Sequence, residues 1–299
     1  MSLSGARLLL SIPSSDSHSG AARSTRTICK MLAGAGMEVR TEPENFRPDI
    51  LFGYGGLSPD IYRYRLAKKK GIKVVFSLRN WGYLNPTGQE LLKSCDAVLS
   101  CSRYLAEVYR KEGVESTALP LPMDLQEVVR LKRDPVFFTM VNPNPEKGLL
   151  IIAQLVEQMR QRRPDILFRV VDRERVGEPW EIYRNTRVLL VPSLWQEPAG
   201  RVAAEALLNG IPPLVSDRGG LPEVCNGGGF VIPVPPDIRP YSAAVPSSVL
   251  EPWIQLIERL KDDEAFYAEE SRKALEASSI YRPEVLAPRY VEFFGRCLR

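Results

Sequence analysis

Two glutamates, Glu197 and Glu205, stand in the stretch EPAGRVAAEALLNG with seven residues between them. The apolar residues 202–204 and 206–208 predict a helix around Glu205 that is buried on nearly every side. An ionised carboxylate in such a helix is costly unless polar groups meet it. Arg201 lies one turn earlier on the same side of the helix and could pair with Glu205. Alternatively, the two carboxylate oxygens could accept the two hydroxyls of a sugar diol.

The segment before this helix has the form of a strand followed by a loop. Val188–Pro192 is an apolar run typical of a buried strand, SLWQEPA is a loop, and Gly200 precedes the helix. The first helical amides, near Arg201 and Val202, lack partners within the helix and lie at the positive end of its dipole. Gly200 would let a ligand approach the backbone closely. We therefore expect a phosphate site here, with Glu197 as an acceptor for further hydroxyl groups.

The elements that would position these residues alternate along the chain. Runs rich in Val, Ile and Leu predict strands at Leu8–Ile12, Ile50–Tyr54, Val74–Ser77, Ala97–Ser100, Val136–Met140, Leu167–Val171, Val188–Pro192, Pro213–Ser216 and Phe230–Ile232. Helical patterns occur at 20–32, 58–70, 103–112, 148–161, 179–186, 201–209, 249–261, 263–277 and 283–297. Such alternation predicts parallel sheets with helices on both faces, and ligands of such sheets lie beyond the carboxyl ends of the strands.

The strand pattern restarts after residue 130, which divides the chain into two halves. A chain of 299 residues is also long for one ordinary domain. We predict an α/β fold of two doubly wound, Rossmann-like domains, the first covering 1–128 and the second 129–280. The proline-rich segment IPVPPDIRPYSAAVP predicts a surface loop.

Composition indicates a soluble globular protein, with 44% hydrophobic and 25% charged residues. The net charge of +4 is mild and its basic residues are scattered, so no nucleic-acid partner is expected. The five cysteines form no C-x-x-C pair, and we expect reduced thiols in a cytoplasmic protein. The opening MSLSGARLLLSIPSS has too short an apolar run for a secretory signal. No segment reaches the roughly 20 apolar residues of a membrane span.

The stretch PSLWQEPAGRVAAEALLNGIPPLVSDRGGLPE closely resembles the donor-site signature of the retaining glycosyltransferases of family 4, also described as glycosyl transferases group 1. Weaker similarity extends over RPDILFGYGG, GIKVVFSLRN, KSCDAVLSCSRYL and LPLPMD. The family has the GT-B architecture, in which two Rossmann-like domains face a cleft. This resemblance implies that the C-terminal helix, within 281–299, crosses back to the N-terminal domain.

The resemblance also implies a role for individual residues. Glu197 would hold hydroxyls of the donor sugar and Glu205 the ribose hydroxyls of the nucleotide. Lys147, in VNPNPEKG, matches the lysine that neutralises the diphosphate, and VVDRERV lies where the family contacts the nucleobase. The backbone would line the donor pocket at Ala199, Gly200, Arg201, Val202, Gly219 and Gly220.

Several positions depart from the family pattern. The arginine that usually stands five residues before the lysine is Asn142 here, which leaves Arg173, Arg201 or Arg23 to supply the second phosphate cation. The N-terminal glycine-rich loop is reduced to SHSGAAR with Gly20. Further departures are Arg79 in place of a histidine that faces the donor sugar, Ala199 in place of an aromatic residue, and His18 as the single histidine of the chain.

The resemblance implies front-face transfer, in which the departing phosphate oxygen takes the acceptor proton and no protein base is needed. Lys147 and the helix amides would stabilise the leaving group. No D-x-D motif follows a strand, so no catalytic metal and no cofactor is expected. The run Asp262-Asp263-Glu264 predicts a helix cap instead.

The implied function is hexosyl transfer from a nucleotide-diphosphate sugar, with UDP as the first expectation and GDP as the second. The acceptor would be a hydroxyl of a glycan, a lipid-linked compound or a small molecule. The basic run RYRLAKKKGIK (63–73) is a solvated helix end or, in a second interpretation, a face for peripheral contact with the inner surface of a membrane. Alternatives are a GT-B nucleotide-sugar epimerase, a Rossmann enzyme that uses NAD, and a non-catalytic protein that binds sugar nucleotides.

Overall fold

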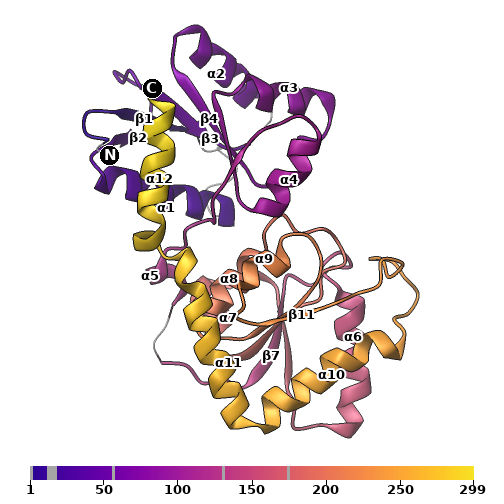
Figure 1. Ribbon diagram of the computed structural model, residues 1–299. Helices are drawn as coiled ribbons and strands as arrows, with labels where there is room; N and C mark the ends of the chain where they lie inside the picture. The colour runs from indigo at the N-terminus through magenta and orange to yellow at the C-terminus, as the bar shows by residue number, and fades with distance from the viewer. Residues whose placement is uncertain (1–2, 12–18, 56–57, 130–131, 174–175) are drawn as a thin grey trace. The chain divides into compact units, whose positions relative to one another are not determined.

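The computed structural model describes residues 3–11, 19–55, 58–129, 132–173 and 176–299. The chain forms two compact units. Figure 1 colours them by residue number. Unit 1 consists of Met1–Asp124 and Ile280–Arg299, and unit 2 of Leu125–Ser279. The sequence analysis places the corresponding boundaries after residues 128 and 280.

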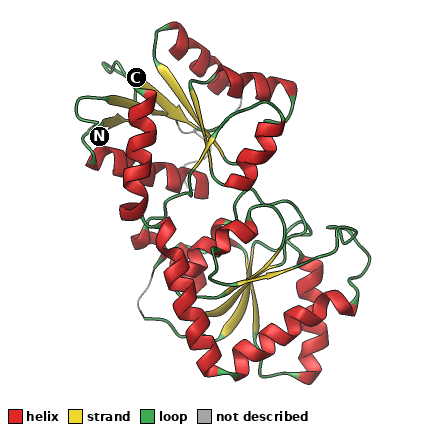
Figure 2. Cartoon of the chain, viewed as in Figure 1, coloured by secondary structure: helices red, strands yellow, loops and turns green. Residues whose placement is uncertain are grey.

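Unit 1 is built on a parallel sheet, whose strands are yellow in Figure 2. The sheet has six strands in the order β2-β1-β3-β4-β5-β6. Its strands are β1 (Arg7–Ser11), β2 (Glu38–Arg40), β3 (Ile50–Gly53), β4 (Lys73–Leu78), β5 (Ala97–Ser100) and β6 (Thr117–Ala118). Strands β3 and β4 are almost entirely buried, as a parallel sheet covered on both faces requires. The edge strand β2 exposes Glu38 and Arg40, so it has no apolar run by which the sequence could predict it.

The helices of unit 1 are α1 (Gly20–Gly34), α2 (Ser58–Lys69), α3 (Pro86–Ser94), α4 (Arg103–Lys111) and α12 (Pro283–Cys297). Helix α12 ends the chain but packs against α1. Its Tyr290 and Phe294 are buried in the core of unit 1, where the rings of Phe294 and Phe52 lie 5.1 Å apart, edge to face. The predicted return of the C-terminal helix to the N-terminal domain is therefore confirmed.

Unit 2 contains a five-stranded parallel sheet in the order β11-β10-β9-β7-β8. Its strands are β7 (Phe137–Val141), β8 (Phe168–Val171), β9 (Thr186–Val191), β10 (Pro213–Ser216) and β11 (Phe230–Ile232). The chain adds β8 on one side of β7 and then β9 on the other. The connections therefore diverge at the carboxyl ends of β7 and β9, which is where doubly wound sheets bind ligands.

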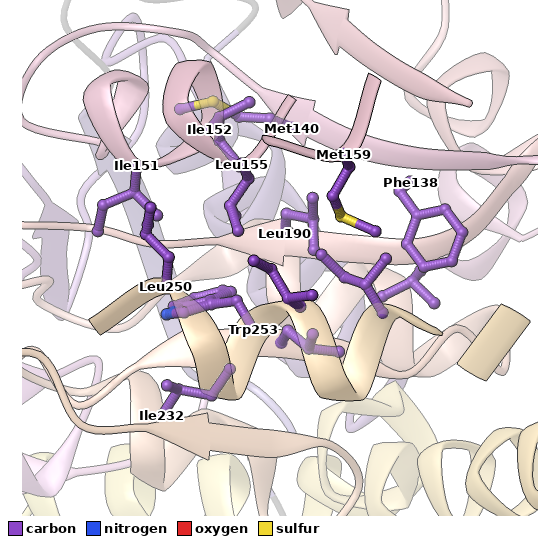
Figure 3. Close-up of a cluster of buried hydrophobic side chains, with 14 of the residues drawn as sticks. Phe138, Met140, Ile151, Ile152, Leu155, Met159, Leu190, Ile232, Leu250 and Trp253 are labelled. Atoms are coloured by element: carbon purple, nitrogen blue, oxygen red, sulfur yellow. The ribbon is translucent and has the colours of Figure 1, made fainter. Parts of the chain in front are cut away.

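Helices cover the sheet of unit 2 on both faces. They are α5 (Leu125–Val128), α6 (Leu149–Arg162), α7 (Pro179–Arg184), α8 (Arg201–Leu208), α9 (Leu221–Cys225), α10 (Ser247–Asp262) and α11 (Glu264–Ala277), and the 3-10 turn Ser278–Tyr281 follows. Leu155 of α6 and Trp253 of α10 pack with Leu190 of β9 in a hydrophobic core cluster of unit 2 (Figure 3). On the other side, α8 contacts β9, β10 and α11.

The predicted fold class is confirmed, since both units are doubly wound parallel α/β structures. Segment 233–246 is a loop as predicted, although Val234, Ile238 and Val245 are buried. Asp263 caps α11 by accepting a hydrogen bond from the amide of Phe266 at 2.8 Å. The short elements β2, β6, α3, α5 and α9 were not predicted from the sequence. Within the described ranges, no helix is long and apolar enough to cross a membrane.

Candidate functional site

A pocket of about 220 Å³ lies in unit 2 at the carboxyl ends of β7 and β9. The order of the strands predicts a ligand site at this position, because the connections diverge there. Its walls are formed by Met140, Val141, Asn142, Lys147, Arg173, Leu190, Val191, Glu197, Gly200, Arg201 and Val202. The structure thus brings together the predicted residues Asn142, Lys147, Arg173 and Glu197 with the beginning of α8.

Lys147 and Glu197 form an ion pair on the wall of this pocket. The Nζ atom of Lys147 lies 2.5 Å from Oε1 of Glu197, and the Ser193 hydroxyl donates to the same oxygen at 2.7 Å. Glu197 is only 6% exposed, whereas the Lys147 side chain is 28% exposed. The Lys147 ammonium also lies 5.0 Å from the ring centre of Trp195. The pair places an acceptor of hydroxyl groups beside a cation.

The backbone before α6 brings Lys147 to the end of β9. Gly148 has a φ of +84°, and a Cβ there would lie 1.9 Å from the carbonyl oxygen of Pro192. The amide of Leu194 donates to the carbonyl of Glu146 at 2.8 Å. Only glycine allows the two loops to approach this closely, which explains the residue that follows Lys147.

The pair Gly219-Gly220 positions the loop that carries Glu197. A Cβ on Gly219 would lie 2.2 Å from the carbonyl oxygen of Glu197, and the φ of Gly219 is +63°. The amide of Gly220 donates to the same carbonyl at 2.7 Å. The sequence analysis predicts that these glycines line the donor pocket, but their close approach is to the backbone of the Glu197 loop, and neither lines the pocket.

Glu205 is fully buried in α8, with 0% exposure. Arg173 donates through both terminal nitrogens to the two carboxylate oxygens at 3.2 Å, and Nε of Arg201 donates to Oε1 at 2.6 Å. The hydroxyl of Tyr183 donates to Oε2 at 2.6 Å. Burial raises the pKa of Glu205, but Arg173, Arg201 and Tyr183 outweigh it and lower the pKa to about 2. The carboxylate is therefore ionised and held by three side chains of the protein.

Asn142, which stands where the family usually has an arginine, makes a different contribution. Its φ is +56°, a conformation that asparagine tolerates better than most residues. Its Oδ1 accepts a hydrogen bond from the backbone amide of Arg173 at 3.1 Å. Asn142 therefore orients the segment after β8 and adds no charge to the pocket.

Residues 173–261 match the family described as glycosyl transferases group 1. The matched residues include Arg173, Glu197 and Glu205, whereas Asn142 and Lys147 lie before them. The spore coat protein SA of Bacillus subtilis (strain 168) is 43% identical over 53 residues, which are 17% of this chain and 14% of that protein. The matched stretch is thus a small part of the curated relative.

Solved structures resemble the chain over nearly its whole length. A glycosyltransferase from Rickettsia africae ESF-5 has a TM-score of 0.71 at 10% identity, with 99% of each chain covered. Sucrose-phosphate synthase from Thermosynechococcus elongatus has a TM-score of 0.68 at 15% identity, covering 97% of this chain and 98% of that one. Anabaena HepE in complex with UDP-glucose has a TM-score of 0.67 at 14% identity, covering 97% and 99%. These likenesses show that the fold is that of GT-B glycosyltransferases.

The remaining predicted donor residues lie in two places. Gly200, Arg201 and Val202 line the pocket at the beginning of α8, but Ala199 does not. In unit 1, Arg79 donates to the carbonyl of Ala21 at 2.5 Å, to the hydroxyl of Thr25 at 2.7 Å and to that of Ser77 at 2.8 Å.

Arg79 therefore joins the end of β4 to the first turn of α1, where Gly20 follows the capping residue Ser19. His18 lies outside the described residues.

Sequence reasoning missed Ser193 and Tyr183, which contact the two glutamates, and it assigned Trp195, which contacts the lysine, to packing. Ser193 and Trp195 lie in the loop SLWQEPA, next to Glu197, and their position in that loop is the signal that could have found them. Tyr183 comes from α7 and reaches Glu205 only because α7 and α8 are neighbours in the folded unit. No local pattern around Tyr183 indicates this contact.

Proposed function

We propose that this protein is a retaining glycosyltransferase of family 4, which transfers a hexose from a nucleotide-diphosphate sugar to a hydroxyl group of an acceptor. UDP is the expected nucleotide. Support comes from the family match over residues 173–261 and from the GT-B fold. Relatives of this fold include HepE, whose structures contain UDP, glucose and UDP-glucose.

The observation that carries the proposal is the contact of Lys147 with Glu197 at the point where the connections of the unit 2 sheet diverge. A donor of this class needs a hydroxyl acceptor for its sugar and positive charge for its diphosphate. Glu197 offers the first and Lys147 the second, within one pocket. An ion pair with a purely structural role could lie anywhere in unit 2. This pair lies at the carboxyl ends of β7 and β9, where sheets of this kind bind ligands.

The proposed reaction breaks the bond between the anomeric carbon and the phosphate oxygen, and the electron pair stays on that oxygen. The acceptor oxygen forms a new bond on the same face of the sugar and passes its proton to the departing phosphate. Negative charge therefore grows on the diphosphate in the transition state. Lys147 stabilises this charge without needing to rearrange, and the step requires neither a protein base nor a metal ion.

Release of nucleoside diphosphate from sugar nucleotides, in the absence of acceptor, tests the proposal. We expect slow hydrolysis of at least one of the common UDP- or GDP-sugars, and a large loss of this activity in Glu197→Gln. Glu270→Gln is a matched control, because Glu270 is, like Glu197, a buried acid of unit 2 that is paired with a lysine. Glu270 lies in α11 and pairs with Lys273, away from the pocket. Binding of a sugar nucleotide without hydrolysis would instead favour a non-catalytic binding protein.

We further propose a cytoplasmic protein that uses a lipid-linked or glycan acceptor in polysaccharide synthesis. Unit 1 has a second pocket, of about 530 Å³, beside α2 and strands β1 and β3. Leu9, Leu51 and Leu66 give it apolar walls, and Arg63 and Lys70 of the basic run 63–73 border it. An apolar chain that ends in an anionic group suits this lining.

Sedimentation with lipid vesicles tests the peripheral membrane contact. We expect binding to vesicles that contain an anionic lipid and weaker binding to neutral vesicles. The double variant Arg63→Ser/Lys70→Ser should lose this preference. Equal sedimentation with both vesicle types would contradict the proposed membrane contact.

A further inference from the structure

The carboxylate of Glu205 is surrounded by hydrogen-bond donors of the protein, whereas the family resemblance implies that it binds the ribose hydroxyls of the nucleotide. A carboxylate has about four lone-pair sites for hydrogen bonds. In this structure Glu205 accepts two bonds from Arg173, one from Arg201 and one from Tyr183. The acceptor capacity of the carboxylate is therefore used by the protein itself. A ribose diol would have to displace at least one of these buried donors.

Arg173 is held at both ends. Its backbone amide donates to Oδ1 of Asn142, and its guanidinium forms a bidentate pair with Glu205. A bidentate arginine–carboxylate pair restricts the orientation of the guanidinium plane. The side chain is nevertheless 17% exposed and forms part of the pocket wall. The same contacts that restrain Arg173 thus leave part of it facing the pocket.

Arg201 reaches the same carboxylate from the first turn of α8. Its side chain is 15% exposed and also lines the pocket. Arg173, Arg201 and Glu205 together carry one positive charge in excess, and Glu127 is a further carboxylate close enough to raise the pKa of Arg173. Lys147, on the same pocket, already faces the carboxylate of Glu197. The excess positive charge at the pocket therefore comes from the arginine cluster.

We propose that Arg173 supplies the second diphosphate cation, in place of the arginine that is absent at Asn142, and that Glu205 is a positioning residue which holds Arg173 and Arg201 at the pocket. This inference rests on the proposed function only in naming the diphosphate of a sugar nucleotide as the ligand. Asn142 then keeps a part in the site, because it fixes the backbone of the arginine that replaces it. Glu205 acts on the phosphates through the arginines and does not bind the ribose.

Inorganic pyrophosphate distinguishes the two roles of Glu205, because it contains the diphosphate and no ribose. The experiment measures the affinities of the full chain for UDP and for pyrophosphate by calorimetry, with Glu205→Gln, Arg173→Gln and the control Glu270→Gln. If Glu205 positions the arginines, Glu205→Gln and Arg173→Gln weaken both ligands by a similar factor. Loss of a hydrogen bond to a charged group predicts on the order of 10- to 100-fold. The control variant should bind both ligands as the wild type does.

A different pattern overturns the inference. If Glu205 binds the ribose, Glu205→Gln weakens UDP and leaves the affinity for pyrophosphate unchanged. Unchanged affinity of Arg173→Gln for pyrophosphate would likewise remove Arg173 from the phosphate site. Arg173→Gln retains Arg201 and Tyr183 on the buried carboxylate, so it keeps the test valid if Glu205→Gln fails to fold.

The proposed function and this inference fail in different ways. Wild-type protein that binds pyrophosphate through Arg173 but binds no UDP, GDP or sugar nucleotide would refute the nucleotide-sugar function and keep the anion site. Wild-type protein that binds UDP, with pyrophosphate affinity independent of Arg173 and Glu205, would keep the function and refute the inference. Wild-type protein that binds neither ligand refutes both.

Discussion

Replacing Glu205 with glutamine should destabilise unit 2 in a manner that depends on pH. Burial raises the pKa of this carboxyl, but Arg173, Arg201 and Tyr183 outweigh it and lower the pKa from 4.5 to about 2. A group with a lower pKa in the folded state contributes stability that is present in full above its unfolded pKa. That contribution is lost as the pH falls toward the folded pKa. The relevant window runs from pH 4.5 down to about pH 2.

The size of the effect follows from the two pKa values. At about 1.36 kcal/mol for each pH unit, a fall from 4.5 to about 2 corresponds to about 3 kcal/mol of folding free energy at neutral pH. The carboxylate has 0% exposure, so solvent does not screen its interactions as it does for surface pairs. Glu205→Gln leaves Arg173 and Arg201 without the anion between them, and the lowered pKa already includes this loss.

Urea unfolding at a series of pH values measures this contribution. Trp180, Trp195 and Trp253 lie in unit 2, so tryptophan fluorescence reports mainly on this unit. We expect Glu205→Gln to be less stable than the wild type by about 3 kcal/mol at pH 7, with a difference that shrinks below pH 4.5. Glu270→Gln controls for the loss of a buried glutamate elsewhere in the unit. A wild-type-to-variant difference that is the same at pH 7 and pH 3 would refute the reasoning.

Three further predictions concern the site and the fold. Lys147→Ala should lower turnover on the order of 10²- to 10³-fold with a smaller change in donor affinity, measured by steady-state release of nucleoside diphosphate; an unchanged rate would assign the leaving-group charge to another cation. Gly219→Ala should displace the Glu197 loop, because the new Cβ would lie 2.2 Å from the carbonyl oxygen of Glu197. It should therefore reduce activity more than the control Gly71→Ala. Gly71 also has a positive φ, but no atom lies within 4 Å of its Cβ position. Phe294→Ala should lower the stability of unit 1 by about 3–5 kcal/mol and leave UDP affinity unchanged, as seen by denaturation and calorimetry; a loss of UDP affinity at full folding would contradict the assignment of the donor site to unit 2.

Much of the fold follows from local sequence patterns. The strands β3, β7, β9 and β10 are buried over nearly their whole length and consist mainly of apolar residues, as is typical of central strands in parallel sheets. Helix α12 has the predicted bounds, since its apolar residues recur with helical spacing. The short edge strands β2 and β6 escaped prediction because pairing with a neighbour, and not an apolar run, defines them.

Part of the candidate site is predictable from a single stretch of sequence, and part depends on the fold. The loop from Ser193 to Glu197 and the beginning of α8 are adjacent in the chain, so their joint contribution to a pocket is readable from the stretch SLWQEPAGRV. Lys147 comes from a separate loop, and its contact with Glu197 depends on the close approach of Gly148 to the end of β9. The resemblance indicated the role of Lys147, but no local pattern contains that contact.

The sequence by itself determined the two doubly wound domains and marked Glu205 as a residue that needs polar partners, because hydrophobic periodicity and the cost of a buried charge are local properties of a segment. Arg201, one helical turn before Glu205, is a partner that the sequence already indicates, and the structure confirms this pair. Only the tertiary structure decided the other partners. Arg173 and Tyr183 reach Glu205 from the end of β8 and from α7, segments that the parallel sheet brings beside α8. Contacts between segments far apart in the chain depend on strand order and helix packing, which no single stretch of sequence specifies.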